Sequence, residues 1–237
     1  MEKPYKSYNG GKESDGTFQK IINILPPHDI YIELFLGNGA IYRNKKPATM
    51  ASILIDIDTA VIKAWSKIKK GSCSIINTDA ISWLENFKVP ADIFKKMGTR
   101  VLIYIDPPYP MDTRKSAKNL YKHEMNDLDH LKLLSAAAGI NANVVISSYP
   151  NKIYNETLKD WCTIEFQSQT RSGTATEKVW YNYPTPTVLH DYKFIGNNYR
   201  DRERIKGIIL RNASKFKRMP PAEVNALIDH LKKENIL

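Results

Sequence analysis

The sequence predicts an α/β protein with a mixed, mostly parallel sheet, an antiparallel hairpin at the end of that sheet and a C-terminal helical extension. Short apolar runs rich in β-branched residues alternate with segments of helical periodicity, which is the pattern of a largely parallel sheet covered by helices. A glycine-rich turn follows the first apolar run, and a basic amphipathic segment closes the chain. We therefore expect a main domain at residues 1–192 and a helical extension at 193–237.

Composition favours a polyanionic partner. The 237 residues hold 35 Lys and Arg against 25 Asp and Glu, a net charge of +10. No polybasic or long amphipathic anchor accompanies this excess, so nucleic acid is favoured over a membrane, and a merely basic soluble protein is the alternative. Cys73 and Cys162 form no metal-spaced cluster, which predicts buried thiols in a reducing cytoplasm and no metal site. Neither a secretory segment nor an apolar run of membrane-spanning length is expected.

The N-terminal third predicts a binding turn. A helix is expected at Thr17–Leu25, stopped by two prolines, and a strand at Ile30–Leu36. Gly37-Asn38-Gly39 then opens a helix, which places backbone N–H groups at the carboxyl edge of the sheet. The third glycine of the dinucleotide fingerprint is missing, so a nucleoside ligand smaller than a dinucleotide fits better. Two further glycines precede Lys12, and Lys12 could reach a carboxylate.

Acidic residues end the next two predicted strands. Asp56 closes the strand Ser52–Asp56 about twenty residues after the glycine turn, a spacing typical of a carboxylate that meets ribose hydroxyls. Asp79 follows the strand Ser74–Asn77. Either acid could instead cap the helix that follows, at Thr59–Lys69 or Ala80–Phe87. The recurrence of acids at one edge of the sheet indicates a shared pocket.

The fourth strand, Val101–Ile105, ends at Asp106-Pro107-Pro108-Tyr109. Two prolines cannot continue a sheet ladder, so the chain leaves the sheet at Asp106. The carboxylate, the two proline carbonyls and the aromatic ring together suit an exocyclic amino group on a flat base. The alternative is a tight turn without function.

Two loops are candidates for nucleic-acid contact. The remaining predicted elements are a helix at Leu128–Ala138, a strand at Asn143–Ser148, a helix at Lys152–Lys159 and two antiparallel strands at Trp161–Gln167 and Lys178–Tyr183. The loops 110–127 and 168–177 carry most of the basic residues that we expect near nucleic acid, namely Arg114, Lys115, Lys118, Lys122 and Arg171. A lid and a mobile hairpin tip are the alternatives.

The segment from Lys193 onward is strongly basic. It holds eleven Lys and Arg against five Asp and Glu, which gives +6 of the chain's +10. Apolar residues recur at helical spacing in two stretches separated by Pro220-Pro221, so we expect two helices. Arg200 and Arg204 are candidates for phosphate contact, and a solvated helix face is the alternative.

From Tyr5 to about Pro184, these motifs resemble the Dam-type, D12-class adenine-N6 DNA methyltransferases. Asp106-Pro107-Pro108-Tyr109 matches the catalytic tetrad of that family in full, and the segment from Glu33 to Ala40 is similar to its cofactor motif, with Leu34 where Pro is usual. The resemblance implies a Rossmann-like S-adenosylmethionine-dependent methyltransferase fold. It also implies that S-adenosylmethionine is the cofactor, held by Tyr8, Lys12, Glu33, Phe35, Gly37, Gly39, Asp56, Ile57, Asp79 and Asp106.

The resemblance implies methyl transfer to the N6 amino group of an adenine flipped out of double-stranded DNA. The base would stack on Tyr109 and donate to Asp106 and to the carbonyl of Pro107, beside Pro108, without a metal. RNA adenine-N6 and DNA cytosine-N4 transfer, and an inactive nucleic-acid-binding homologue, are the alternatives. The family's target-recognition region between Asp79 and Asp106 is cut down. A cytoplasmic, nucleoid-associated protein of prokaryotic or phage type, monomeric or weakly dimeric, is expected, with a restriction endonuclease considered as a partner.

Overall fold

The computed structural model describes residues 2–5, 10–14, 16–68, 73–87, 98–113, 121–170 and 173–234. These residues form two compact units, 1–193 and 194–237. The boundary expected from the sequence, between residues 192 and 193, falls next to this division.

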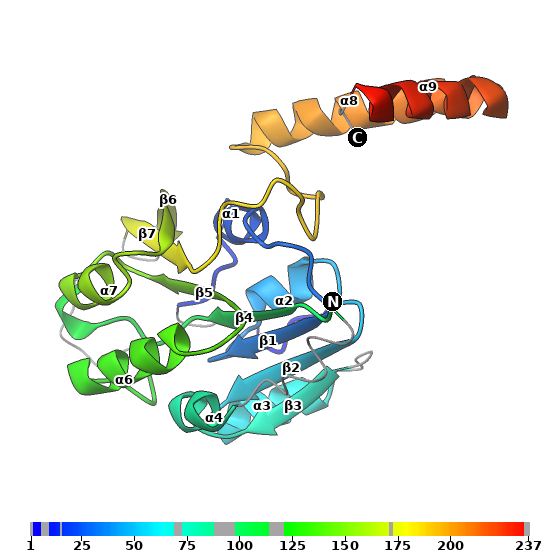
Figure 1. Ribbon diagram of the computed structural model, residues 1–237. Coiled ribbons are helices and arrows are strands. Elements are labelled where there is room, and N and C mark those ends of the chain that lie inside the picture. The colour runs from blue at the N-terminus through cyan, green and yellow to red at the C-terminus, as the bar shows by residue number, and fades with distance from the viewer. Residues whose placement is uncertain are drawn as a thin grey trace. The chain divides into compact units, whose positions relative to one another are not determined.

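The first unit is built on a seven-stranded sheet of order β3-β2-β1-β4-β5-β7-β6 (Figure 1). Strands β1 to β5 pair in parallel, whereas β7 runs antiparallel to both β5 and β6. This arrangement confirms the predicted mixed, mostly parallel sheet that ends in an antiparallel hairpin. The strands are β1 (Ile30–Leu34), β2 (Ala51–Asp56), β3 (Cys73–Asn77), β4 (Val101–Ile105), β5 (Asn143–Ser148), β6 (Cys162–Thr170) and β7 (Gly173–Tyr181).

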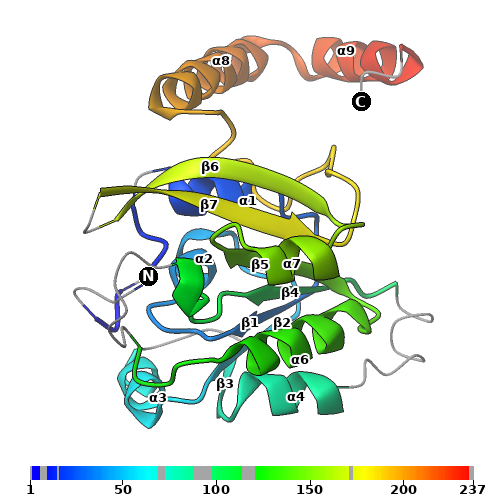
Figure 2. The ribbon, with the colours of Figure 1, turned by 90° about the vertical axis from the view of Figure 1, so that its left-hand side faces the viewer.

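Helices cover both faces of the sheet (Figure 2). Those of the first unit are α1 (Thr17–Ile22), α2 (Ala40–Asn44), α3 (Thr59–Ser66), α4 (Ala80–Asn86), α6 (Asp127–Ala138) and α7 (Lys152–Thr157), with a 3-10 turn η1 (Met111–Thr113). Apolar residues of α4, α6 and α7 belong to one buried cluster with the sheet, and α3 belongs to a separate cluster with Leu54. Because Ile53 and Ile55 belong to the first cluster and Leu54 to the second, α3 lies on the opposite face from α4, α6 and α7.

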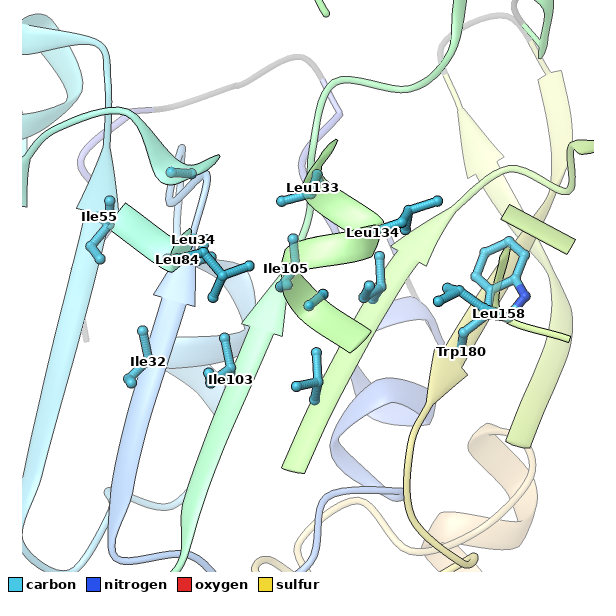
Figure 3. Close-up of a cluster of buried hydrophobic side chains, with 14 of the residues drawn as sticks. Ile32, Leu34, Ile55, Leu84, Ile103, Ile105, Leu133, Leu134, Leu158 and Trp180 are labelled. Atoms are coloured by element: carbon cyan, nitrogen blue, oxygen red, sulfur yellow. The ribbon is translucent and has the colours of Figure 1, made fainter. Parts of the chain in front are cut away.

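The larger cluster fixes the central strands in place (Figure 3). Ile103 and Ile105 of β4 pack in the same cluster as Leu133 and Leu134 of α6, all fully buried. All of β4 is buried on both faces, which is why its sequence is a continuous apolar run rather than an alternating one. Truncating a residue such as Leu134 to Ala should cost about 2–5 kcal/mol. The core therefore holds rigid the strand whose end carries Asp106.

The hairpin differs from the prediction. The residues expected to form a loop at 168–177 are largely strand, because β6 extends to Thr170 and β7 begins at Gly173. Their polar character is compatible with a ribbon that faces solvent on one side. Cross-strand hydrogen bonds such as Gln167 Nε2 to Thr176 Oγ1, at 3.0 Å, stabilise it. The predicted polar loop at 168–177 is therefore wrong, and the contact of this hairpin with nucleic acid stays a prediction.

Smaller corrections concern helix ends and a thiol. Helix α1 ends at Ile22 rather than Leu25, and α7 ends at Thr157 rather than Lys159. Cys162 is exposed rather than buried, because β6 is the edge strand of the sheet. None of the helices in the described ranges is long and apolar enough to cross a bilayer.

The second unit contains the two predicted helices, α8 (Tyr199–Arg218) and α9 (Pro221–Lys233). Asn198 caps α8, and its side chain accepts from the backbone N–H of Asp201 at 3.0 Å. Neither helix has a buried residue. Apolar residues of α8 such as Ile209 and Leu210 are therefore exposed.

Candidate active site

A cavity of about 400 Å³ opens at the carboxyl ends of β1, β2 and β4. This volume is within the usual range for small-molecule sites, and the carboxyl edge of a parallel sheet is where such sites form. Most of the site residues expected from the sequence line it, namely Lys12, Glu33, Phe35, Gly37, Gly39, Asp56, Ile57, Asp106, Pro107 and Pro108. The sheet thus brings together segments that are far apart in the chain, from Lys12 to Pro108.

The turn after β1 forms one wall of the cavity, and its backbone has a positive φ at Phe35, Gly37 and Gly39. Phe35 has a φ of 58°, which is unusual for a bulky residue and marks a constrained site. Gly39 has a φ of 59°, and a Cβ atom there would lie 2.4 Å from Cζ2 of Trp65. Trp65 also donates its indole N–H to the carbonyl of Gly37 at 2.8 Å. Gly39 is therefore required both by the backbone and by the close approach of α3.

Asp56 lies in the cavity wall at the end of β2. One carboxylate oxygen accepts the backbone N–H of Gly37 at 2.9 Å, and the other accepts that of Asp58 at 2.8 Å. Burial raises the pKa of Asp56, and these two donors oppose that shift. The cap of α3 is Asp58, which accepts from Ala60 N at 2.9 Å. Asp56 is therefore not the helix cap, and its carboxylate is oriented by the glycine turn.

Asp79 behaves differently from Asp56. Its carboxylate caps α4 by accepting the backbone N–H of Ser82 at 2.8 Å, which confirms the capping interpretation. It is not among the residues that line the cavity, so its contact with a cofactor stays a prediction. Ile57, which follows Asp56, does line the cavity and is 41% exposed.

Glu33 is a buried carboxyl group at the cavity. It accepts the hydroxyl of Tyr31 at 2.6 Å and the backbone N–H of Tyr42 at 3.0 Å. Burial raises the pKa of Glu33 to about 7, although both donors act in the opposite direction. Lys45 is also buried nearby, and burial lowers its pKa to about 7. Glu33 thus links the glycine-turn helix to the sheet.

Asp106 is the carboxylate at the end of β4, and it has strong donors. Lys12 Nζ lies 2.5 Å from its Oδ1, and the Ser147 hydroxyl donates to the same oxygen at 3.0 Å. The hydroxyl of Tyr104 pairs with that of Ser147 at 2.8 Å, which orients Ser147. Burial raises the pKa of Asp106, and Lys12 is the largest influence that opposes this. The arrangement favours an ionised, oriented hydrogen-bond acceptor.

Tyr109 is almost fully buried, at 5% exposure, and is not among the residues that line the cavity, so its stacking on a base stays a prediction. Its hydroxyl donates a short hydrogen bond to Glu177 of β7, and its ring meets that of Tyr149 edge-on at 4.5 Å between centroids. Lys12 Nζ lies over the Tyr109 ring, 4.7 Å from its centroid. Burial raises the pKa of Tyr109 well above its usual value, and Glu177 raises it further. The ring is therefore held in a fixed orientation by the hairpin.

The predicted nucleic-acid residues divide into three groups. Lys122 lines the cavity and donates to Asp58 at 2.8 Å, so it is tied to the α3 cap. Arg200 and Arg204 lie on α8 in the second unit, where Arg204 pairs with Asp201 at 2.7 Å. The others, together with Tyr8 of the expected cofactor site, lie outside the described residues: Arg114, Lys115, Lys118 and Arg171.

Sequence inspection missed Glu177 and Ser147. Glu177 is 2% exposed and was assigned to a polar loop, yet its period-two spacing from Val179 and Tyr181 places it on the same inward side of β7. That alternation was the available signal. Ser147 lies within the apolar strand β5, and nothing in its local sequence indicates the contact with Asp106.

Comparison with known proteins gives a fold likeness and no family. A scan against known protein families finds no match, and neither does a search of curated proteins. Among solved structures, the S-adenosylmethionine-dependent methyltransferase from Agrobacterium tumefaciens is 12% identical with a TM-score of 0.44, covering 70% of this chain and 60% of that one. This chain thus spans less than two thirds of that protein.

Two further solved structures have similar scores. The N-methyltransferase NodS from Bradyrhizobium japonicum WM9 is 11% identical with a TM-score of 0.45, covering 69% of this chain and 92% of that one. The 23S rRNA methyltransferase ErmE is 11% identical with a TM-score of 0.42, covering 91% of this chain and 87% of that one. Likeness at this level identifies no substrate, so function must be inferred from the cavity itself.

Proposed function

We propose that this protein transfers the methyl group of S-adenosylmethionine to the N6 amino group of an adenine flipped out of DNA. The observation that carries the proposal is the position of Asp106. Its oriented carboxylate lies at the same cavity as the glycine turn and Asp56. An acceptor for an amino group and a nucleoside-sized site thus share one edge of the sheet.

The residues of the cavity fit the adenosine part of the cofactor. Asp56 has both oxygens fixed by backbone N–H groups, and each oxygen keeps lone-pair capacity for a ribose hydroxyl. Gly37 and Gly39 both line the cavity, and both have the positive φ that glycine adopts readily. Ile57 would supply an apolar contact for a purine ring. When bound, S-adenosylmethionine supplies a methyl group on a positively charged sulfur.

Asp106 would accept a hydrogen bond from the amino group of the target base. The carbonyl of Pro107, which has no N–H of its own, would accept the second amino hydrogen. These two bonds draw the nitrogen lone pair away from the ring and orient it. Negative charge on Asp106 also stabilises the positive charge that develops on the nitrogen. The contribution of the protein is positioning and electrostatics, which is worth most in a buried site.

DNA as the acceptor is supported by the net charge of +10 and by the buried aromatic ring beside Asp106. A base inside a duplex cannot reach a cavity of this kind, so it must be extruded into it. Basic residues of the loop at 110–127 and of α8 are the candidates for phosphate contact. We infer that double-stranded DNA is the partner. Among the described residues, no cluster of His, Cys, Asp or Glu is arranged to hold a metal ion.

The test is methyl transfer from labelled S-adenosylmethionine to unmethylated duplex DNA, followed by nucleoside analysis. N6-methyladenine is expected with the wild type. Asp106→Asn should reduce kcat by a factor of about 100 or more, because it removes the charge at the reacting nitrogen. Asp160→Asn, an exposed acid after α7, is the matched control. Label only in RNA or in cytosine, or equal activity of Asp106→Asn and wild type, would rule the proposal out.

A further inference from the structure

Lys12 occupies the place that the proposed acceptor base needs. Its ammonium is bound to Asp106 at 2.5 Å and lies 4.7 Å from the centre of the Tyr109 ring. A base that stacks on this ring and donates to this carboxylate would compete with Lys12 for both. Lys12 must therefore shift its contacts before the base can bind.

Glu177 is the second carboxylate within reach of Lys12. Lys12 Nζ is 3.5 Å from Glu177 Oε1, and the same oxygen accepts the Tyr109 hydroxyl. The side chains of Lys12 and Glu177 are 5% and 3% exposed, so the pair is nearly removed from water. Glu177 comes from β7, and no motif of the predicted active site includes it.

The cost of an unpaired buried charge explains why a second carboxylate lies near Lys12. An ammonium that leaves its only carboxylate partner inside a protein becomes an unpaired buried charge, which is strongly unfavourable. With Glu177 present, Lys12 can release Asp106 and stay paired. Asp106 is then free to accept from the substrate. Burial raises the pKa of Glu177, and Lys12 is the largest influence that opposes this shift.

We propose that Glu177 is a positioning residue of the acceptor site, which holds Lys12 when the amino group of the substrate binds Asp106. This inference rests on the proposed function. Glu177 acts through Lys12 and does not touch the base. A purely structural alternative is that Glu177 only anchors the Tyr109 hydroxyl. Tyr109→Phe separates the two roles, because it removes that hydroxyl and keeps both the ring and the carboxylate.

The experiment is a double-mutant cycle on kcat and on KM for duplex DNA, at saturating S-adenosylmethionine. Glu177→Gln keeps the shape and removes the charge, so Lys12 stays on Asp106, kcat falls by a factor of about 30 or more and KM for DNA rises. In a Lys12→Met background the same change should alter kcat by less than about threefold, because no ammonium remains to be held. Glu165→Gln is the matched control, since Glu165 lies on the same hairpin and pairs at its surface with Lys178 at 2.9 Å.

Three results would contradict the role proposed for Glu177. Equal activity of Glu177→Gln and wild type would overturn the inference, and so would an equal loss in both backgrounds. A Tyr109→Phe variant as impaired as Glu177→Gln would assign Glu177 to anchoring instead. Thermal unfolding shows whether each variant is folded. If Glu177→Gln does not fold, Glu177→Asp takes its place, because it keeps the charge on a shorter side chain. It should show a smaller defect that Lys12→Met again suppresses.

A wild type that methylates no acceptor would refute the proposed function and leave the ion pair to be tested directly. NMR titration of ¹³C-labelled lysine reports the Lys12 ammonium without any substrate. Glu177→Gln should lower the pKa of Lys12, because burial lowers this pKa and the two carboxylates raise it. An unchanged Lys12 titration would show that Glu177 is not its counter-ion.

Discussion

The glycine turn after β1 gives a sharp test of how the cavity is built. Gly39→Ala adds one methyl group where Cζ2 of Trp65 would be 2.4 Å and Cη2 2.9 Å away. Trp65 is fully buried and bonded to the carbonyl of Gly37, so it has little freedom to withdraw. The turn must shift instead, and it is the same turn that orients Asp56.

Two costs add in this variant. A left-handed backbone at Ala costs about 1–2 kcal/mol more than at Gly. Forcing a methyl group into a filled core costs about 1–3 kcal/mol. We therefore expect Gly39→Ala to lower the free energy of unfolding by roughly 2–5 kcal/mol and to weaken binding of S-adenosylmethionine.

The matched control is Gly98→Ala. Gly98 has a φ of 60°, almost equal to the 59° of Gly39, but a Cβ atom there would have nothing within 4 Å. It carries the backbone cost without the clash. Urea unfolding gives both free energies, and calorimetry gives the cofactor affinity. If Gly39→Ala and Gly98→Ala are equally stable and bind the cofactor equally, close approach of Trp65 does not determine the turn.

Other predictions concern charge. Because the pKa of Glu33 is raised to about 7, its contribution to stability is present below its ordinary pKa and is lost as the pH rises through about 7. Relative to Glu33→Gln, the wild type should thus lose up to about 3 kcal/mol between pH 4.5 and 8, and parallel stability curves from urea unfolding would contradict this. Ser147→Ala removes a hydrogen-bond donor that lowers the pKa of Asp106. The acid limb of the pH profile of kcat should therefore move to higher pH, and kcat should fall about 10-fold. An acid limb that does not move would show that Ser147 does not act on Asp106. Replacing Arg200 and Arg204 by Gln should reduce the salt dependence of DNA binding by up to about two ions released, for all sequences alike, whereas an unchanged slope would assign α8 to other contacts.

Local sequence was enough to predict where strands end and where turns follow them. The end of β4 was predicted because two prolines after an apolar run can only mean that the strand stops at Asp106. The glycine turn was predicted for a similar reason. What could not be predicted is set by contacts between distant segments. Ser147 of β5 and Glu177 of β7 reach Lys12 and Asp106 because β5 lies next to β4 and β7 lies next to β5 in the sheet order.

Local sequence also could not distinguish an acid that caps a helix from an acid that lines the cavity. Asp56 and Asp58 are two residues apart, and the same local pattern allows either to cap α3. The structure assigns the cap to Asp58 because the carboxylate of Asp56 is already held by the N–H of Gly37, across the sheet edge. The hairpin was misjudged for a different reason. Threonine and glutamine in its tip are equally compatible with a loop and with a solvent-facing ribbon, and pairing between the two strands decides the matter.

That correction narrows where base recognition can occur. With β6 and β7 paired as far as Thr170 and Gly173, the hairpin offers a rigid edge instead of a long adaptable loop. Rigid strands present side chains at fixed spacing, so contacts from this edge to DNA would position the duplex more readily than they would follow its bases. The loop at 110–127 is the better candidate for reading the target, because Tyr121, Lys122 and His123 at its end already line the cavity. A chimera that exchanges only this loop should change the preferred sequence around the adenine, whereas exchange of the hairpin tip should change affinity alone.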